Sequence, residues 1–209
     1  MTFDRQGIAH GICAPRYFMR DETIFRQGDR ARGWYEVVEG MARVCQFRSD
    51  GRRQVLAFAV PGDIIGLEHG YRDSCAEALT PMLLSHHSLA SGEAQANLPW
   101  DRVVRHNHQC LALIGLPTAI ERVAAFILTM GYRLGARAQF DLPLSRADIA
   151  DHLGLTMHTV SRTICDLARR GMVRVEAHHH FHLTDADALA AIAGIDPSEF
   201  HSNDQQLVA

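Results

Sequence analysis

The sequence predicts an α+β protein with a β-rich N-terminal domain, a long central helix and a C-terminal winged helix-turn-helix domain. Three observations lead to this prediction. Between about residues 16 and 92, short runs of β-forming residues alternate with glycine-containing turns. From Trp100 onward, apolar residues recur at helical spacing instead. Within residues 142–182, small, flexible and branched residues follow one another at the spacing of a helix-turn-helix.

The β-rich segment is predicted from its turns as much as from its strands. The predicted strands are Thr23–Phe25, Trp34–Val38, Met41–Phe47 and Gln54–Val60. Each leads into a turn that contains glycine, and Asp50-Gly51 between two of them is typical of a β-hairpin. Short strands with such turns about 8–12 residues apart indicate a sandwich or a barrel.

The central segment carries an apolar stripe on a helix predicted over Trp100–Leu116, which Gly115 and Pro117 end. The stripe consists of Val103, Val104, Cys110, Leu111 and Ile114. It fits either an ordinary core helix or a helix that forms a dimer with a second copy of the chain. A second amphipathic helix is predicted over Ala119–Leu134.

The helix-turn-helix is the strongest motif of the sequence. Ser145 is a suitable N-cap for a helix over Arg146–Leu153, and Thr156 caps a second helix from Met157 to about Arg170. Gly154 permits a tight turn between them, because glycine adopts positive φ at little cost.

The helix-turn-helix interior follows from the spacing of Ala150, Gly154 and Val160. The small alanine lets the helices approach closely, and the branched valine packs between them. The remaining core positions are Ile149, Leu153, Ile164 and Leu167. Met172–Ala177 and Phe181–Leu183 then form a two-stranded hairpin, the wing.

Helical phase predicts which side chains of the second helix reach DNA. The face opposite the core carries His158, Ser161, Arg162, Cys165 and Arg169. We expect His158, Ser161 and Arg162 to contact bases, because they lie near the N-terminal end of the helix. Arg162 can donate two hydrogen bonds to one guanine. The candidates for phosphate contacts are Arg146, Thr156, Thr159, Arg169, Arg170 and Arg174. For Arg169 and Arg170 the alternative is a solvated helix end that the macrodipole favours.

The overall composition excludes several classes of protein. The net charge of −3 over 209 residues gives no global nucleic-acid signal, so a DNA surface must be local; all 21 basic residues are arginine. No apolar run reaches the ~18 residues of a membrane span, and no long apolar stretch follows Asp4 and Arg5, so we expect a cytoplasmic protein. No Gly-rich phosphate loop, H-E-x-x-H or G-x-S-x-G is present, so we do not expect an enzyme.

The cysteines and histidines point to no metal or cluster. The odd number of cysteines, five, argues against a disulfide framework in a cytoplasmic chain. No C-x-x-C pair is present, so we expect no zinc site or iron–sulfur cluster. The run His178–His182 fits either a metal site or, as we prefer, a wing that touches phosphates or solvent. Cys165 is either a redox-sensitive thiol on the DNA-facing side or an inert small residue.

Four stretches of the sequence resemble the CRP/FNR superfamily of bacterial transcription regulators. They are Asp21–Phe25 with Gly28-Asp29, Val60–Gly66, Glu121–Ile127, and Leu153–Thr156 with Thr159–Arg162. The resemblance implies a β-roll, cyclic-nucleotide-binding-like domain, a dimerisation helix and a winged helix-turn-helix. It also implies a homodimer that binds double-stranded DNA at a palindromic operator and contacts RNA polymerase. The expected divisions are 1–99 for the β-roll, 100–138 for the dimerisation and connecting helices, 139–195 for the DNA-binding domain, and a flexible tail over 196–209.

Three departures from the superfamily's usual pattern bear on which branch the chain resembles. Only Cys13 lies where FNR carries its cluster cysteines. Glu68 and Arg72 resemble a cyclic-nucleotide phosphate site, but Asp73 beside the arginine opposes a phosphate. His158 stands where FNR-like and FixK-like recognition helices have glutamate. The first two departures favour a FixK-like or nitrogen-oxide-responsive regulator of low-oxygen or nitrogen-oxide metabolism.

The alternative is a member of the same superfamily that a small effector controls. The effector would be a haem, nitric oxide or a cyclic nucleotide. No spacing points to a haem with a His or Cys axial ligand, and we assign no cofactor.

Overall fold

The computed structural model describes residues 15–88, 100–135, 138–177 and 179–196. The chain divides into two compact units, Met1–His106 and Asn107–Ala209. Cys13, His178 and residues 197–209 of the expected tail lie outside the described residues. The division falls inside the central helix, whereas the expected domain boundary lies at its start; the domain boundaries stay predictions.

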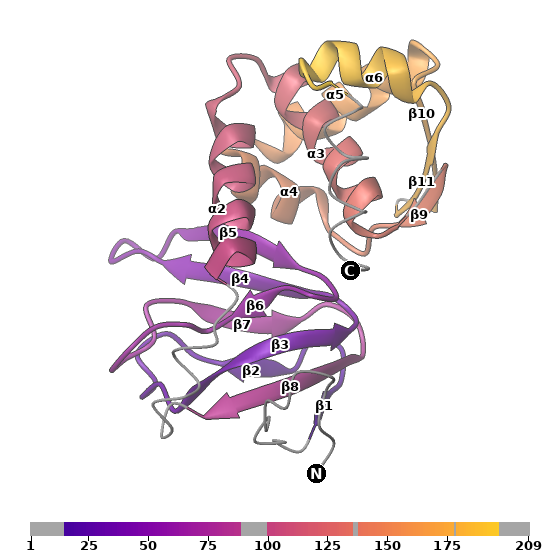
Figure 1. Ribbon diagram of the computed structural model, residues 1–209. Helices are drawn as coiled ribbons and strands as arrows, with labels where there is room; N and C mark the ends of the chain where they lie inside the picture. Colours follow the sequence, from indigo (N-terminus) through magenta and orange to yellow (C-terminus); the bar gives the residue numbers. More distant parts are fainter. Residues whose placement is uncertain (1–14, 89–99, 136–137, 178, 197–209) are drawn as a thin grey trace. The chain divides into compact units, whose positions relative to one another are not determined.

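The first unit is a β-roll of two four-stranded antiparallel sheets (Figure 1). One sheet has the order β1-β8-β3-β6 and the other β2-β7-β4-β5. The strands are β1 (Arg16–Phe18), β2 (Thr23–Phe25), β3 (Gly33–Glu39), β4 (Ala42–Phe47), β5 (Arg53–Ala59), β6 (Ile64–Ile65), β7 (Cys75–Ala78) and β8 (Met82–Ser88). The expected β-roll class is confirmed, although the sequence reasoning did not predict β1, β6, β7 or β8.

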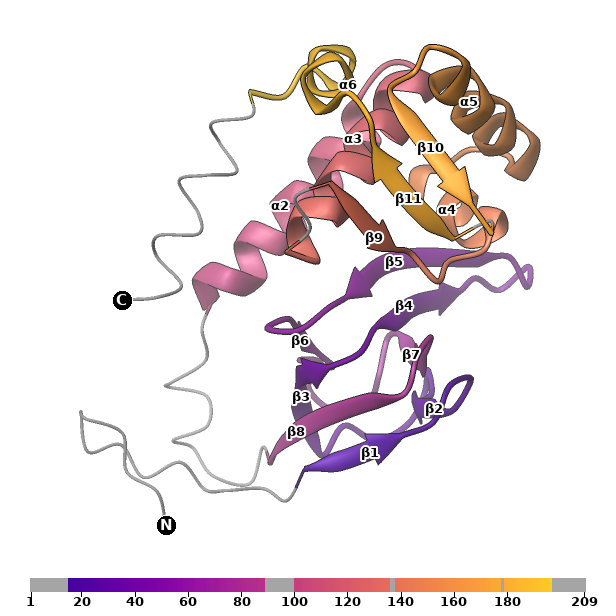
Figure 2. The same cartoon turned by 90° about the vertical axis from the view of Figure 1, so that its right-hand side faces the viewer.

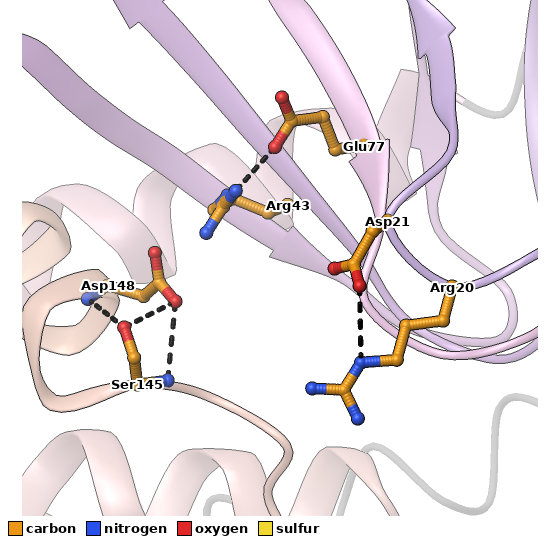
Figure 3. Close-up of polar contacts among 6 residues, drawn as sticks. All are labelled: Arg20, Asp21, Arg43, Glu77, Ser145 and Asp148. Carbon is orange, nitrogen blue, oxygen red and sulfur yellow. Dashed lines mark hydrogen bonds and ion pairs between the residues drawn. The ribbon is translucent and has the colours of Figure 1, made fainter.

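Apolar side chains from both sheets form the core of the β-roll. They include Phe25, Tyr35, Val37, Ala59, Ile65, Ala76, Met82 and Leu84, all buried. Arg43 on β4 and Glu77 on β7 form a cross-strand ion pair, drawn in Figure 3. The Asp50-Gly51 hairpin is confirmed, with the Gly51 amide donating to the Arg48 carbonyl at 2.9 Å and Gly51 at φ 81°.

Helix α2 (Trp100–Gly115) begins in the first unit and ends in the second, and its bounds agree with the sequence prediction. Of its residues only Leu113 is buried. No helix in the described residues is long and apolar enough to span a bilayer.

The second unit contains the helix-turn-helix. Its helices are α3 (Ala119–Arg133), α4 (Arg146–Leu153), α5 (Met157–Arg169) and α6 (Ala186–Ala193). Its strands are β9 (Gln139–Asp141), β10 (Val173–Glu176) and β11 (His180–Leu183), which lie side by side in the order β10-β11-β9 (Figure 2). The prediction of a two-stranded wing therefore needs correction, because β9 adds a third strand on which Phe140 stacks against Phe181 at 5.7 Å between ring centres.

Candidate nucleic-acid interface

Helix α4, the first helix of the helix-turn-helix, is capped at both ends. The Ser145 hydroxyl accepts from the Asp148 amide at 3.0 Å, and the Asp148 carboxylate accepts from the Ser145 amide at 3.2 Å (Figure 3). Gly154 ends the helix at φ 64° and ψ 36°, the left-handed conformation that its lack of a side chain allows. Both features agree with the sequence prediction.

Helix α5 starts at a threonine cap. The Thr156 hydroxyl accepts from the Thr159 amide at 3.1 Å and lies 2.9 Å from the Thr159 hydroxyl. These two expected phosphate contacts therefore also fix the first turn of α5. A helix N-terminus favours anions, because its first amides lack helical partners and the macrodipole is positive there.

The burial of α5 agrees with the predicted helical phase. Val160, Ile164 and Leu167 are buried together with Ile149 and Leu153 of α4. The opposite face exposes four side chains and leaves Ser161 half-buried: the exposed ones are His158, Arg162, Cys165 and Arg169. The predicted phase thus agrees with the side of α5 that lies away from its packed face.

That outward face borders a hollow of about 820 Å³. Its lining contains all three expected base contacts, together with Thr159, Cys165, Asp166 and Arg169. Ala119 and Ile120, in the first turn of α3, also line it, and sequence reasoning did not assign them to the site. The T-x-x-E pattern of Thr118 and Glu121 marks the start of α3, but nothing local in sequence places that start beside α5.

The candidate arginines differ in their surroundings. Within the part of the chain that the structure describes, Arg162 has no hydrogen-bonding partner, whereas Arg169 and Arg170 both pair with Asp166. The Arg146 guanidinium lies over the Phe181 ring at 5.5 Å, and burial lowers the pKa of Arg146. Arg174 pairs with Glu176 at 3.2 Å. Only Arg162 thus combines exposure with an unengaged guanidinium.

The wing histidines contact carboxylates. His180 Nδ1 lies 2.7 Å from Asp141 Oδ1, and His182 Nε2 lies 3.7 Å from Glu176 Oε1. In the described ranges, no three His, Cys, Asp or Glu side chains are grouped so that they could hold a metal ion.

The β-roll contains a second hollow, of about 390 Å³, lined by Arg16, Arg30, Arg32, Arg72 and His86 among others. Arg72 is buried, and its guanidinium donates to the carbonyls of Gly66 and Gly33 and to Glu68. Ser74 donates to the other oxygen of Glu68. The residues that resemble a phosphate site are therefore bound to their own chain.

Two family models match the chain. Residues 15–88 match the cyclic nucleotide-binding domain, and residues 121–192 match the Crp-like helix-turn-helix domain. Among curated proteins, the nitrogen fixation regulation protein FixK of Rhizobium meliloti is 36% identical, over 81% of this chain and 82% of that protein. FixK of Bradyrhizobium diazoefficiens is 34% identical, over 85% of this chain and 81% of that protein.

Solved structures show the same architecture. FixK2 from Bradyrhizobium japonicum matches with a TM-score of 0.76 and 34% identity, over 86% of this chain and 96% of that one. A CRP-family transcriptional regulator from Thermus thermophilus matches with a TM-score of 0.71 and 26% identity, over 86% of this chain and 96% of that one.

Proposed function

Because the chain belongs to the CRP/FNR family, in its FixK-like branch, we propose that it is a homodimeric transcription regulator that binds a palindromic operator. The observation that carries this proposal is the outward face of α5, where His158, Ser161 and Arg162 border one hollow. An exposed helix of this kind fits the major groove, and its N-terminal side chains reach base edges.

Each side chain of that face has a role in the proposal. Arg162 donates two hydrogen bonds to guanine, and Ser161 and His158 contact neighbouring bases or phosphate. Thr156 and Thr159 meet a phosphate at the N-terminus of α5, next to the first turn of α3 with Ala119 and Ile120. Arg146, Arg169 and Arg170 supply further phosphate contacts from the edges of the site.

Dimerisation runs through α2 in this proposal. Its exposed apolar side chains are Trp100, Val104, Leu111 and Ile114, and Val103 and Cys110 beside them are half-buried. These four lie 4, 7 and 3 residues apart, which fits the two apolar positions of the seven-residue repeat with which two helices pack together. A stripe that the described residues leave exposed favours the dimer-helix interpretation over the core-helix one.

The physiological role follows from the relatives. The FixK proteins are named regulators of nitrogen fixation, and we propose that this chain activates genes of low-oxygen or nitrogen-oxide metabolism with RNA polymerase as its partner. The operator sequence tests this directly. In a selection from random DNA, we expect a palindrome whose half-site centres lie about 10 base pairs apart. Recovery of sequences without a common motif would contradict the proposal.

The basic hollow of the β-roll favours a second candidate, control by a small anionic effector. Its arginines would attract an anion, although Arg72 is already bound to carbonyls and to Glu68. A thermal-shift screen with cyclic nucleotides, haem and nitric oxide donors separates the two. A regulator without an effector shows no shift, and an effector that binds raises the melting temperature of the β-roll.

A further inference from the structure

Asp166 places a carboxylate on the recognition helix among the residues that would meet DNA. It lines the same hollow as Arg162, Cys165 and Arg169. Its two oxygens serve two different arginines: Oδ1 accepts from Arg169 Nη2 at 2.9 Å, and Oδ2 lies 2.7 Å from Arg170 Nη2. One carboxylate thus binds both guanidinium groups.

The helix gains little from a carboxylate here. Asp166 lies in the C-terminal part of α5, where the macrodipole disfavours negative charge. The side chains of Arg169 and Arg170 are 78% and 51% exposed, so solvent screens both pairs. The two ion pairs are therefore expected to contribute little to the stability of the fold.

We propose that Asp166 competes with DNA phosphates for Arg169 and Arg170 and thereby weakens sequence-independent DNA binding. This inference rests on the proposed function. To reach a phosphate, each arginine must first leave Asp166, and the carboxylate then repels the phosphate backbone. Two exposed ion pairs of this kind are worth about two- to thirtyfold in an equilibrium constant per subunit.

The consequence is greater sequence specificity. Binding to random DNA depends almost wholly on phosphate contacts, whereas operator binding also draws on base contacts such as that of Arg162. A competitor that acts on phosphate contacts therefore lowers the affinity for random DNA by a larger factor than the affinity for the operator. Asp166 is a specificity-determining residue in this sense, and it acts through the two arginines.

The test compares Asp166→Asn with the wild-type dimer on the selected operator and on random DNA over a range of salt concentrations. We expect the variant to bind random DNA about two- to thirtyfold more tightly per subunit, with a smaller gain on the operator. The slope of log affinity against log salt should steepen by about one to two per subunit, because two more phosphates are neutralised. Asp187→Asn is the matched control, since it removes the same charge from an exposed site on α6.

A third variant tests the route of the effect. In an Arg169→Ala, Arg170→Ala background, Asp166→Asn should change the salt slope no more than the control does. If Asp166→Asn does not fold, Asp166→Ala removes the same charge with a higher helix propensity. Equal salt slopes for wild type and Asp166→Asn would overturn the inference, as would a loss of operator binding in the variant. A wild-type protein that binds no DNA would instead refute the proposed function itself.

Discussion

The side chain of Arg122 donates a hydrogen bond from Nη1 to the carbonyl of Leu153 at 3.2 Å. Leu153 is the last residue of α4, and the carbonyls of a final helical turn have no helical partner. The Nε of the same guanidinium donates to the carbonyl of Leu116 at 2.7 Å. One side chain of α3 therefore ties the segment after α2 to the turn of the helix-turn-helix.

Arg122→Ala should destabilise the second unit. Hydrogen bonds to a charged group are each worth about 1.5–3 kcal/mol, and the variant leaves two carbonyls without their donor. Arg122→Lys should recover little, because an ammonium cannot reproduce the planar fork that spans both carbonyls. Both tryptophans, Trp34 and Trp100, lie in the first unit, so circular dichroism of the helices is the appropriate measurement.

The matched control for Arg122 is Arg174→Ala, at a side chain that is 65% exposed. Its effect on the free energy of unfolding should stay within about 0.5 kcal/mol. If Arg122→Ala unfolds at the same denaturant concentration as this control, the two hydrogen bonds do not stabilise the unit.

The second prediction concerns the α2 stripe. Ile114→Glu should bury an unpaired carboxylate in the dimer interface, at a cost of several kcal/mol. Light scattering should then show a monomer, and operator binding should be lost. Ala112→Glu, at an exposed position outside the stripe, should leave the dimer intact. A dimer that survives Ile114→Glu would place the interface elsewhere on the chain.

The helix-turn-helix could be predicted because its determinants are local. The caps at Ser145 and Thr156, the left-handed Gly154 and the period of Val160, Ile164 and Leu167 all act within a few residues. The third strand of the wing could not be predicted in this way. Strand β9 has three residues, and its pairing of Phe140 with Phe181 joins positions far apart in sequence.

The role of Asp166 shows the limit of interpreting one helix face at a time. From sequence, Arg169 and Arg170 are predicted to contact phosphates or solvent, and the acidic residue before them carries no prediction. Asp166 precedes them by three and four residues, the spacings at which helical side chains meet. That local signal was available, whereas the approach of Ala119 and Ile120 to α5 depends on tertiary packing.

The third prediction concerns the thiols. Burial raises the pKa of Cys45 to about 12 and also raises the pKa of Cys75, so neither forms the reactive thiolate readily. Cys165 is exposed on the side of α5 that we propose faces DNA. Peroxide should therefore weaken operator binding of the wild type, because an oxidised Cys165 adds negative charge opposite phosphate.

Cys165→Ser should keep its operator binding under the same peroxide treatment. Cys75→Ser, at a buried cysteine of the β-roll, should lose operator binding under peroxide to the same extent as the wild type. Equal losses in Cys165→Ser and the wild type would exclude a redox role for Cys165.

The fourth prediction concerns pH and the β-roll. Burial lowers the pKa of His86 below its ordinary value of 6.5, and the charges of Arg16, His87 and Arg72 lower it further. The unfolded state therefore binds this proton more readily than the folded state. Above its ordinary pKa, His86 is neutral in both states and does not change the free energy of unfolding. As the pH drops below that value, the unfolded state binds the proton first and the free energy of unfolding falls.

The fluorescence of the tryptophans, both in the first unit, should report this loss. From about pH 7.5 to about pH 5.5, the melting temperature of the wild type should fall further than that of His86→Gln, which carries no titratable imidazole. Parallel pH profiles for the two proteins would show that His86 binds its proton equally well in both states.

The last prediction concerns His158, which is exposed in the first turn of α5 and borders the same hollow as Arg162. An ionised glutamate at this position only accepts hydrogen bonds and therefore suits the amino group of cytosine. A histidine can donate one, which suits guanine N7 or O6. We therefore expect the half-site to differ from the FNR-type sequence at the base pair that glutamate reads, while the pair contacted by Arg162 stays the same.

The measurement for His158 is the affinity of the wild type and of His158→Glu for operators varied at one base pair, with Arg162→Ala as the control. Arg162→Ala should lose about 1–3 kcal/mol of discrimination at its own base pair and change the preference at the His158 pair little. If wild type and His158→Glu rank the operators identically, His158 does not read a base.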